Sequence, residues 1–212
     1  PLNSSSTTYT KCPTTSLKEQ VSFLVSSASL LVEKGEFDRG KEILNLLLNV
    51  CPELPDIYPP LVSLYTQPPN QNPFLATYYA KTYVDLKPYE LDPTNKLENI
   101  YQNTQFIPVD EWISIWKDLH RKHPKSPCIL CGLGRALESA GDANSAEEIY
   151  IQATKKGKKD DPCLFLAYYR LINLYFNKND FKKANETLTR ALTLYPDNKY
   201  LLQLRQKLKF KD

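Results

Sequence analysis

The chain has 212 residues, of which 42% are apolar, with six glycines and sixteen prolines. This composition excludes wholesale disorder and a glycine-rich β-fold, and it favours helices separated by short prolyl turns. The net charge of +3 divides into −3 for residues 1–100 (8 Lys/Arg, 11 Asp/Glu) and +6 for residues 101–212 (19 Lys/Arg, 13 Asp/Glu). The basic half suits an acidic protein or a nucleic-acid backbone, although charged faces are often simply solvated.

The five cysteines are an odd number, and the sequence shows neither a signal peptide nor an apolar run of membrane-spanning length. Disulfides persist mainly in oxidising compartments, where cysteines usually come in pairs. We therefore expect an intracellular, cytoplasmic protein without a membrane span.

The first part of the chain reads as a flexible tail followed by three helix pairs. Residues 1–16 are rich in Ser, Thr and Pro and lack periodic apolar positions. Apolar residues at helical spacing then predict repeat units at residues 17–52, 54–88 and 90–124. The segment 66–73 (TQPPNQNP) cannot be helical throughout, so the turn of the second unit is enlarged.

Two similar units follow, at residues 127–161 and 162–196. Leu133 and Leu171 are 38 residues apart, and the same spacing separates several further pairs of apolar residues. Self-similarity at one period is typical of stacked helical repeats. Gly141 and Asn179 are suited to left-handed geometry at the end of a helix, and the aspartate after each is suited to capping the next helix.

Prolines close each unit at a nearly regular interval. They are Pro52, Pro88, Pro124, Pro162 and Pro196, separated by 36, 36, 38 and 34 residues. Proline stops a helix because it lacks the N–H group and clashes with the preceding turn. A last helix at 198–210 has one leucine stripe and one polar face, as a terminal capping helix requires.

These residues resemble the tetratricopeptide repeat family, over roughly residues 17–210. The family's Leu-Gly pair is matched by Leu133-Gly134, and its turn Gly-Asp by Gly141-Asp142. Its small–aromatic–small run is matched by Ala146, Tyr150 and Ala153. The resemblance implies an all-α, right-handed α-solenoid of about five helix pairs plus a C-terminal capping helix, in which the small residues allow close helix packing.

The resemblance also implies a non-enzymatic scaffold or adaptor that binds a segment of a protein partner in a concave groove lined by the first helix of each pair. The polar groove candidates on the last two units are Arg135, Ser139, Tyr169, Arg170, Asn173 and Asn177. Their amide, phenol and guanidinium groups suit a peptide backbone or a carboxylate, but they also suit a solvated helix face.

Neither catalysis nor a cofactor is favoured. Both histidines lie on one short segment, and no glycine-rich phosphate loop is present. One weak zinc candidate consists of His120, His123, Cys128 and Cys131. These are suitable ligand types, but their spacing is far shorter than in usual zinc modules, and buried structural cysteines explain the pattern more simply.

Two other surfaces leave alternative functions open. Trp112 and Trp116 share a helical face, and they are core residues or, if exposed, docking aromatics of an architectural subunit in a large assembly. A basic edge consists of Lys155, Lys156, Lys158, Lys159, Lys182 and Lys183. This edge would suit an RNA- or ribonucleoprotein-associated subunit, although no aromatic residues are interleaved with the lysines.

Overall fold

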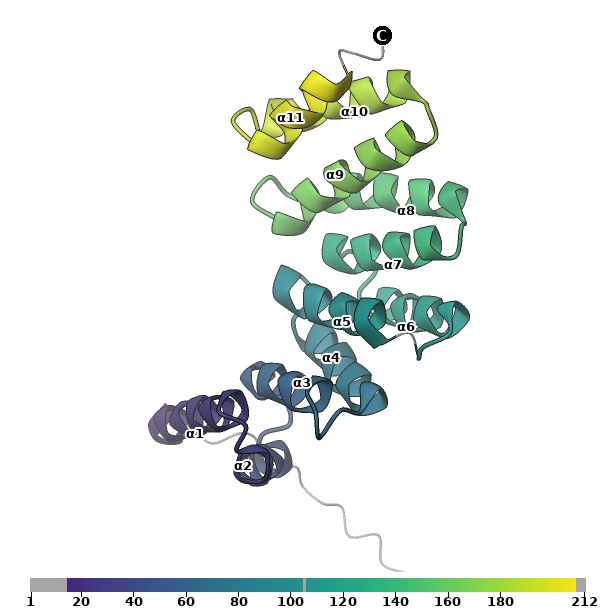
Figure 1. Cartoon of the computed structure of the whole chain (residues 1–212). Helices are drawn as coiled ribbons and strands as arrows, with labels where there is room; N and C mark the ends of the chain where they lie inside the picture. The colour runs from purple at the N-terminus through teal and green to yellow at the C-terminus, as the bar shows by residue number, and fades with distance from the viewer. Residues whose placement is uncertain (1–14, 105, 209–212) are drawn as a thin grey trace, which may run out of the picture. The chain divides into compact units, whose positions relative to one another are not determined.

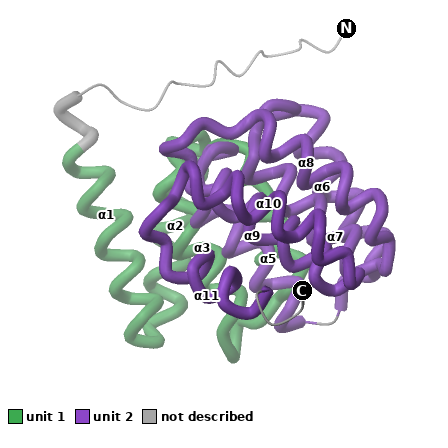
Figure 2. The backbone as a smooth tube through the Cα atoms, turned by 90° about the horizontal axis from the view of Figure 1, so that it is seen from above, with its two compact units in different colours: residues 1–86 green, residues 87–212 purple. Residues whose placement is uncertain are grey.

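The structure is a computed structural model that describes residues 15–104 and 106–208. The chain divides into two compact units, Pro1–Leu86 (unit 1) and Lys87–Asp212 (unit 2), coloured separately in Figure 2. Most of the predicted tail, residues 1–14, lies outside the described part. The first described helix begins at Thr15, within the range predicted to be tail.

The described residues of unit 1 form four α-helices and a short 3-10 helix, arranged as Figure 1 shows. The elements are α1 (Thr15–Glu33), α2 (Phe37–Val50), η1 (Pro55–Ile57), α3 (Tyr58–Thr66) and α4 (Pro73–Leu86). The helices pack as α1 on α2 and α3 on α4, with the apolar core between them. The residues between α3 and α4 are not helical, as the proline-rich sequence of 66–73 predicts.

In unit 2 the residues that the structure describes form seven α-helices. These helices follow one another in a stacked order in Figure 1. They are α5 (Leu91–Thr104), α6 (Val109–Lys122), α7 (Pro127–Ser139), α8 (Ala143–Lys156), α9 (Pro162–Asn177), α10 (Phe181–Leu194) and α11 (Lys199–Leu208). Every regular element among the described residues is a helix, so the predicted all-α repeat fold is confirmed.

The turns inside the last two pairs have the geometry that the sequence predicts. Gly141 has φ +79° and Asn179 has φ +59°, both in the left-handed region that glycine and asparagine tolerate. Asp142 caps α8 by accepting a hydrogen bond from the N–H of Ser145 at 3.0 Å. Asp180 caps α10 in the same way, because its carboxylate accepts from the N–H of Lys183 at 3.1 Å. These polar turns end one helix and begin the next.

Small residues bring the helices of unit 2 close together. A Cβ atom placed on Gly134 would lie 2.4 Å from the ring of Tyr150, which is fully buried between α7 and α8. On the other side of α7, a Cβ on Gly132 would lie 2.3 Å from the ring of Trp116. Glycine is therefore required at both positions by the close approach of an aromatic ring, not by backbone conformation.

The last described helix, α11, packs on α10. Leu201 and Leu208 of α11 are buried, and Leu204 between them is partly buried. Gln203 and Arg205 are exposed on the same helix. An apolar face on α10 and a polar face toward water are what a terminal helix needs in a repeat stack.

Candidate partner-binding face

The first helices of the pairs in unit 2 lie next to one another. Helix α7 contacts both α5 and α9, although α6 and α8 separate them in sequence. Side chains that point outward at equivalent positions of α7 and α9 can therefore act together. We define the candidate face as the predicted groove residues on these two helices: Arg135, Ser139, Tyr169, Arg170, Asn173 and Asn177.

A buried carboxylate from α5 lies behind this face. Glu98 is only 2% exposed, and its Oε2 atom is 2.9 Å from Nη1 of Arg135 on α7. Glu98 Oε1 and the Nε of Arg170 are both buried and have no hydrogen-bond partner. Arg135 and Arg170 are partly exposed. The charges of both guanidinium groups act on this carboxylate, and Arg135 forms an ion pair with it.

Burial dominates the protonation of Glu98. It raises the pKa of this carboxyl group from 4.5 to about 7, although Arg135 and then Arg170 act to lower it. Close to neutral pH, Glu98 is therefore partly protonated, and the two arginines leave the cluster with a net positive charge.

The neutral polar residues of the face are partly committed to their own helices. Asn173 Nδ2 donates to the carbonyl oxygen of Tyr169 at 2.9 Å, and Ser139 Oγ donates to the carbonyl oxygen of Arg135 at 3.0 Å. Ser139 and Asn177 are exposed, whereas Tyr169 and Asn173 are partly exposed. The structure thus places all six predicted residues where they reach solvent to some degree.

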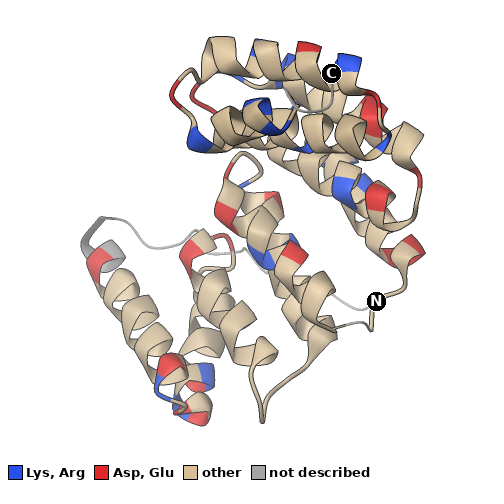
Figure 3. Cartoon of the chain, turned by 45° about the horizontal axis from the view of Figure 1, so that its top comes forward, with Lys and Arg blue, Asp and Glu red and all other residues tan. Residues whose placement is uncertain are grey.

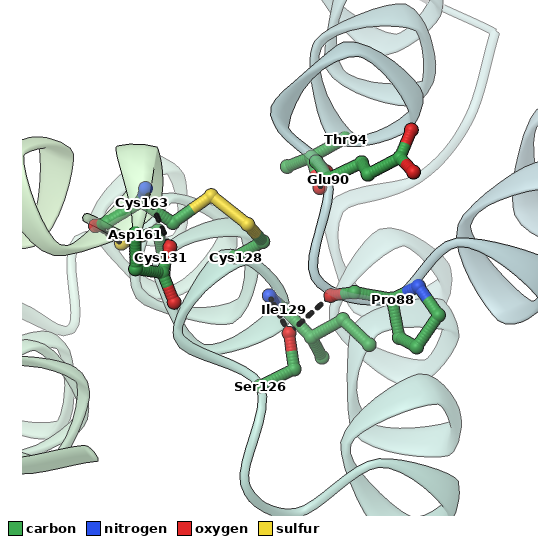
Figure 4. The surroundings of a disulfide bond; sticks show 9 residues. All are labelled: Pro88, Glu90, Thr94, Ser126, Cys128, Ile129, Cys131, Asp161 and Cys163. Atoms are coloured by element: carbon green, nitrogen blue, oxygen red, sulfur yellow. Dashed lines mark hydrogen bonds between the residues drawn. A yellow bond between two sulfur atoms is a disulfide. The ribbon is translucent and has the colours of Figure 1, made fainter. Parts of the chain in front are cut away.

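A disulfide bond between Cys128 and Cys163 joins the first turn of α7 to the first turn of α9 (Figure 4). The two Cα atoms are 4.9 Å apart, and the residues are 35 apart in sequence. The third cysteine of this region, Cys131, is free and buried, and its Sγ donates to the carbonyl oxygen of Cys163 at 3.6 Å. The odd number of cysteines gave no indication of this bond.

The disulfide bond also argues against the weak zinc candidate. Among the described residues, the ligand-type atoms found within 4.8 Å of one another belong to Cys128, Asp161 and Cys163. The structure does not bring His120 and His123 into this group, and the sulfur of Cys128 is bonded to Cys163. The four residues proposed from spacing alone therefore do not form one site.

The hypothesis of docking tryptophans is wrong in this structure. Trp112 is 1% exposed and Trp116 is fully buried, with their ring centroids 5.6 Å apart. The ring of Tyr101 stacks on Trp112 at 4.6 Å. The shared helical face that the sequence predicts is correct, but it belongs to the core.

The predicted basic edge is only partly available. Lys156 Nζ donates to the carbonyl oxygen of Pro124 at 2.6 Å, and Lys183 forms an ion pair with Glu147 at 3.2 Å. All six lysines of the edge are exposed, and the four outside these two contacts are Lys155, Lys158, Lys159 and Lys182. In Figure 3 the ribbon carries acidic as well as basic residues along the helices, so charges of both signs are interspersed in the sequence of these helices.

Two residues of this region were missed in the sequence. Glu98 lies in the least regular repeat, where no motif indicates which positions face α7. Cys163 had a usable signal, because Pro127-Cys128 and Pro162-Cys163 start equivalent helices with the same dipeptide. Equivalent positions on neighbouring first helices are expected to lie side by side.

Comparison with known proteins agrees with this architecture. A family model described as tetratricopeptide repeat matches residues 166–198. A thermophilic tetratricopeptide repeat protein of Thermus thermophilus, TTC0263, is 19% identical, with a TM-score of 0.53 over 90% of this chain and 98% of that one. The fold is therefore that of tetratricopeptide repeat proteins, and the resemblance expected from the residues is confirmed.

Two further solved structures have the same fold. YrrB, described as a tetratricopeptide repeat protein with an unusual peptide-binding site, is 15% identical, with a TM-score of 0.53 over 86% of this chain and 90% of that one. PilF of Pseudomonas aeruginosa is 13% identical, with a TM-score of 0.55 over 92% of this chain and 85% of that one. No curated protein sequence matches this chain.

In the part of the chain that the structure describes, no helix is both long enough and apolar enough to cross a bilayer.

Proposed function

We propose that this protein is a non-enzymatic interaction scaffold that binds a segment of a protein partner at the candidate face of α7 and α9. The observation that carries the proposal is the pair Arg135 and Arg170, which lie equally far from the start of neighbouring first helices and are partly exposed. Guanidinium groups provide several donors in a fixed geometry for carbonyl and carboxylate oxygens. YrrB, which has the same fold, is described as having a peptide-binding site.

The ion pair between Arg135 and Glu98 decides which residues of the candidate face are replaced in a test. Replacing Arg135 alone would leave the buried carboxylate of Glu98 without its 2.9 Å partner, and such a variant would lose stability as well as binding. A triple variant, Arg170→Gln with Asn173→Ala and Asn177→Ala, keeps this ion pair, and we call it the face variant. Because interface arginines often contribute more than 1 kcal/mol, we expect it to capture the partner about tenfold less well.

Capture is measured with the immobilised full chain in an extract of the source cells, followed by quantitative mass spectrometry. The matched control replaces three exposed lysines of the basic edge, Lys158, Lys159 and Lys182, with alanine. Circular dichroism verifies that both variants are folded. Equal capture by the face variant and the unmodified protein would refute the assignment, and loss in the lysine variant alone would move the interaction to the basic edge.

A further inference from the structure

The Cys128–Cys163 disulfide connects the same two helices that carry the candidate face. It bypasses α8 and joins α7 directly to α9 at their first turns (Figure 4). Arg135 lies about two helical turns beyond Cys128, and Arg170 lies about two turns beyond Cys163. Since helices are stiff over this length, a covalent link at the first turns restrains the spacing of the two arginines.

Both sulfur atoms are buried, so exchange with a solute requires local opening. The first turn of a helix is the part best suited to open, because its N–H groups lack partners within the helix. In α9 the first turn is held by Asp161, whose carboxylate accepts from the N–H of Cys163 at 2.8 Å. The connector before it includes the exposed residues Lys158, Lys159 and Asp160.

The neighbouring cysteine does not compete for the pair. Burial raises the pKa of the Cys131 thiol well above its usual value, so this group is a poor nucleophile. Cys128 and Cys163 lie instead in the first turns of α7 and α9, bonded to each other. Cys128 and Cys163 are therefore singled out by their place in the first helical turns as well as by their closeness to each other.

We propose that Cys128 and Cys163 are a reversible thiol–disulfide site that exchanges with low-molecular-weight thiols and disulfides, and whose closed form holds α7 and α9 at the spacing that the partner requires. The second part rests on the proposed function. When the Cys128–Cys163 bond forms, one cysteine thiolate first attacks a small disulfide R–S–S–R. This step gives a mixed disulfide and releases one thiolate R–S⁻. The other cysteine thiolate then attacks the bonded cysteine sulfur and releases the second thiolate. Two cysteines are oxidised, one R–S–S–R is reduced to two R–SH, and opening is the reverse.

The redox part is tested by equilibrating the full chain in mixtures of reduced and oxidised glutathione, trapping free thiols and mapping them by mass spectrometry. We expect Cys128 and Cys163 to change together, in native conditions, while Cys131 stays unlabelled. Reduction should accelerate amide hydrogen exchange in the first turns of α7 and α9 at least tenfold. The redox proposal is overturned if the pair stays reduced in excess oxidised glutathione, or if it opens only when the whole unit unfolds.

The coupling to partner binding is tested with the double variant Cys128→Ser/Cys163→Ser, with Cys131→Ser as the matched control. We expect the double variant to capture the partner at least fivefold less well, and the control to capture it normally. Normal capture by the double variant, while the face variant loses capture, overturns the coupling and leaves the proposed function standing. If the face variant also captures normally, the proposed function fails together with the coupling, whereas glutathione exchange still decides the redox part independently.

Discussion

Replacing Gly134 or Gly132 with alanine is expected to lower the free energy of unfolding of unit 2 by about 3 kcal/mol, the upper end of the usual cost of overpacking. The added Cβ atom would lie 2.4 Å from the ring of Tyr150 in the first case, and 2.3 Å from that of Trp116 in the second. Both rings are fully buried, so neither has room to retreat. Alanine favours a helix over glycine by only about 1 kcal/mol, so the clash outweighs the gain.

Urea unfolding followed by circular dichroism measures the effect. Gly141→Ala is the informative control, since a Cβ there meets no atom within 4 Å but the residue has φ +79°. That variant has backbone strain without a clash, and we expect a loss of about 1–2 kcal/mol. If Gly132→Ala and Gly134→Ala cost no more than Gly141→Ala, the close packing around α7 is not as described.

The fold was predictable because its determinants are local. A glycine or asparagine at the end of one helix, an aspartate at the start of the next and a proline after each pair act within a few residues of chain. Gly141 and Asp142 behave in the structure as their residue types predict. Tyr150 was also predictable, since a small–aromatic–small pattern indicates a large ring between two closely packed helices.

The burial of the tryptophans required information that the spacing lacks. Trp112 and Trp116 were predicted to share a face, but the period of a helix does not reveal whether another element covers that face. The cover on Trp116 is α7, which approaches closely at Gly132. No repeat motif requires glycine at that position, so the contact could not be read from one sequence.

The candidate site was predictable only where its residues lie in the regular repeats. Arg135 and Arg170 belong to the regular repeats, where position on the helix indicates the exposed side. Glu98 comes from α5, in a repeat with no clear motif, and it reaches Arg135 only through the tertiary contact of α5 with α7. Spacing along the chain groups Cys128 with the nearby histidines, whereas its bonded partner lies one repeat further along.

Glu98 makes the stability of unit 2 depend on pH. Its pKa is raised in the folded state from 4.5 to about 7, so between these values the folded protein binds more protons than the unfolded chain. The contribution of Glu98 is therefore fully favourable below about pH 4.5, and it is lost as the pH rises through about 7. A difference of 2.5 units (7 minus 4.5) corresponds to about 3 kcal/mol.

Glu98→Gln removes this ionisation and keeps an oxygen that can accept from Arg135. We expect the variant to be more stable than the unmodified protein at pH 8, by up to about 3 kcal/mol, and the advantage to vanish near pH 4.5. Urea midpoints measured from pH 4.5 to pH 8 test this, and the difference between the two proteins cancels the titration of all other groups. A difference that is constant with pH, or that grows toward low pH, would show that the ion pair with Arg135 outweighs burial and that Glu98 remains ionised in the fold. Arg135 would then be fully neutralised, and Arg170 would be the arginine of the pair left to bind a partner.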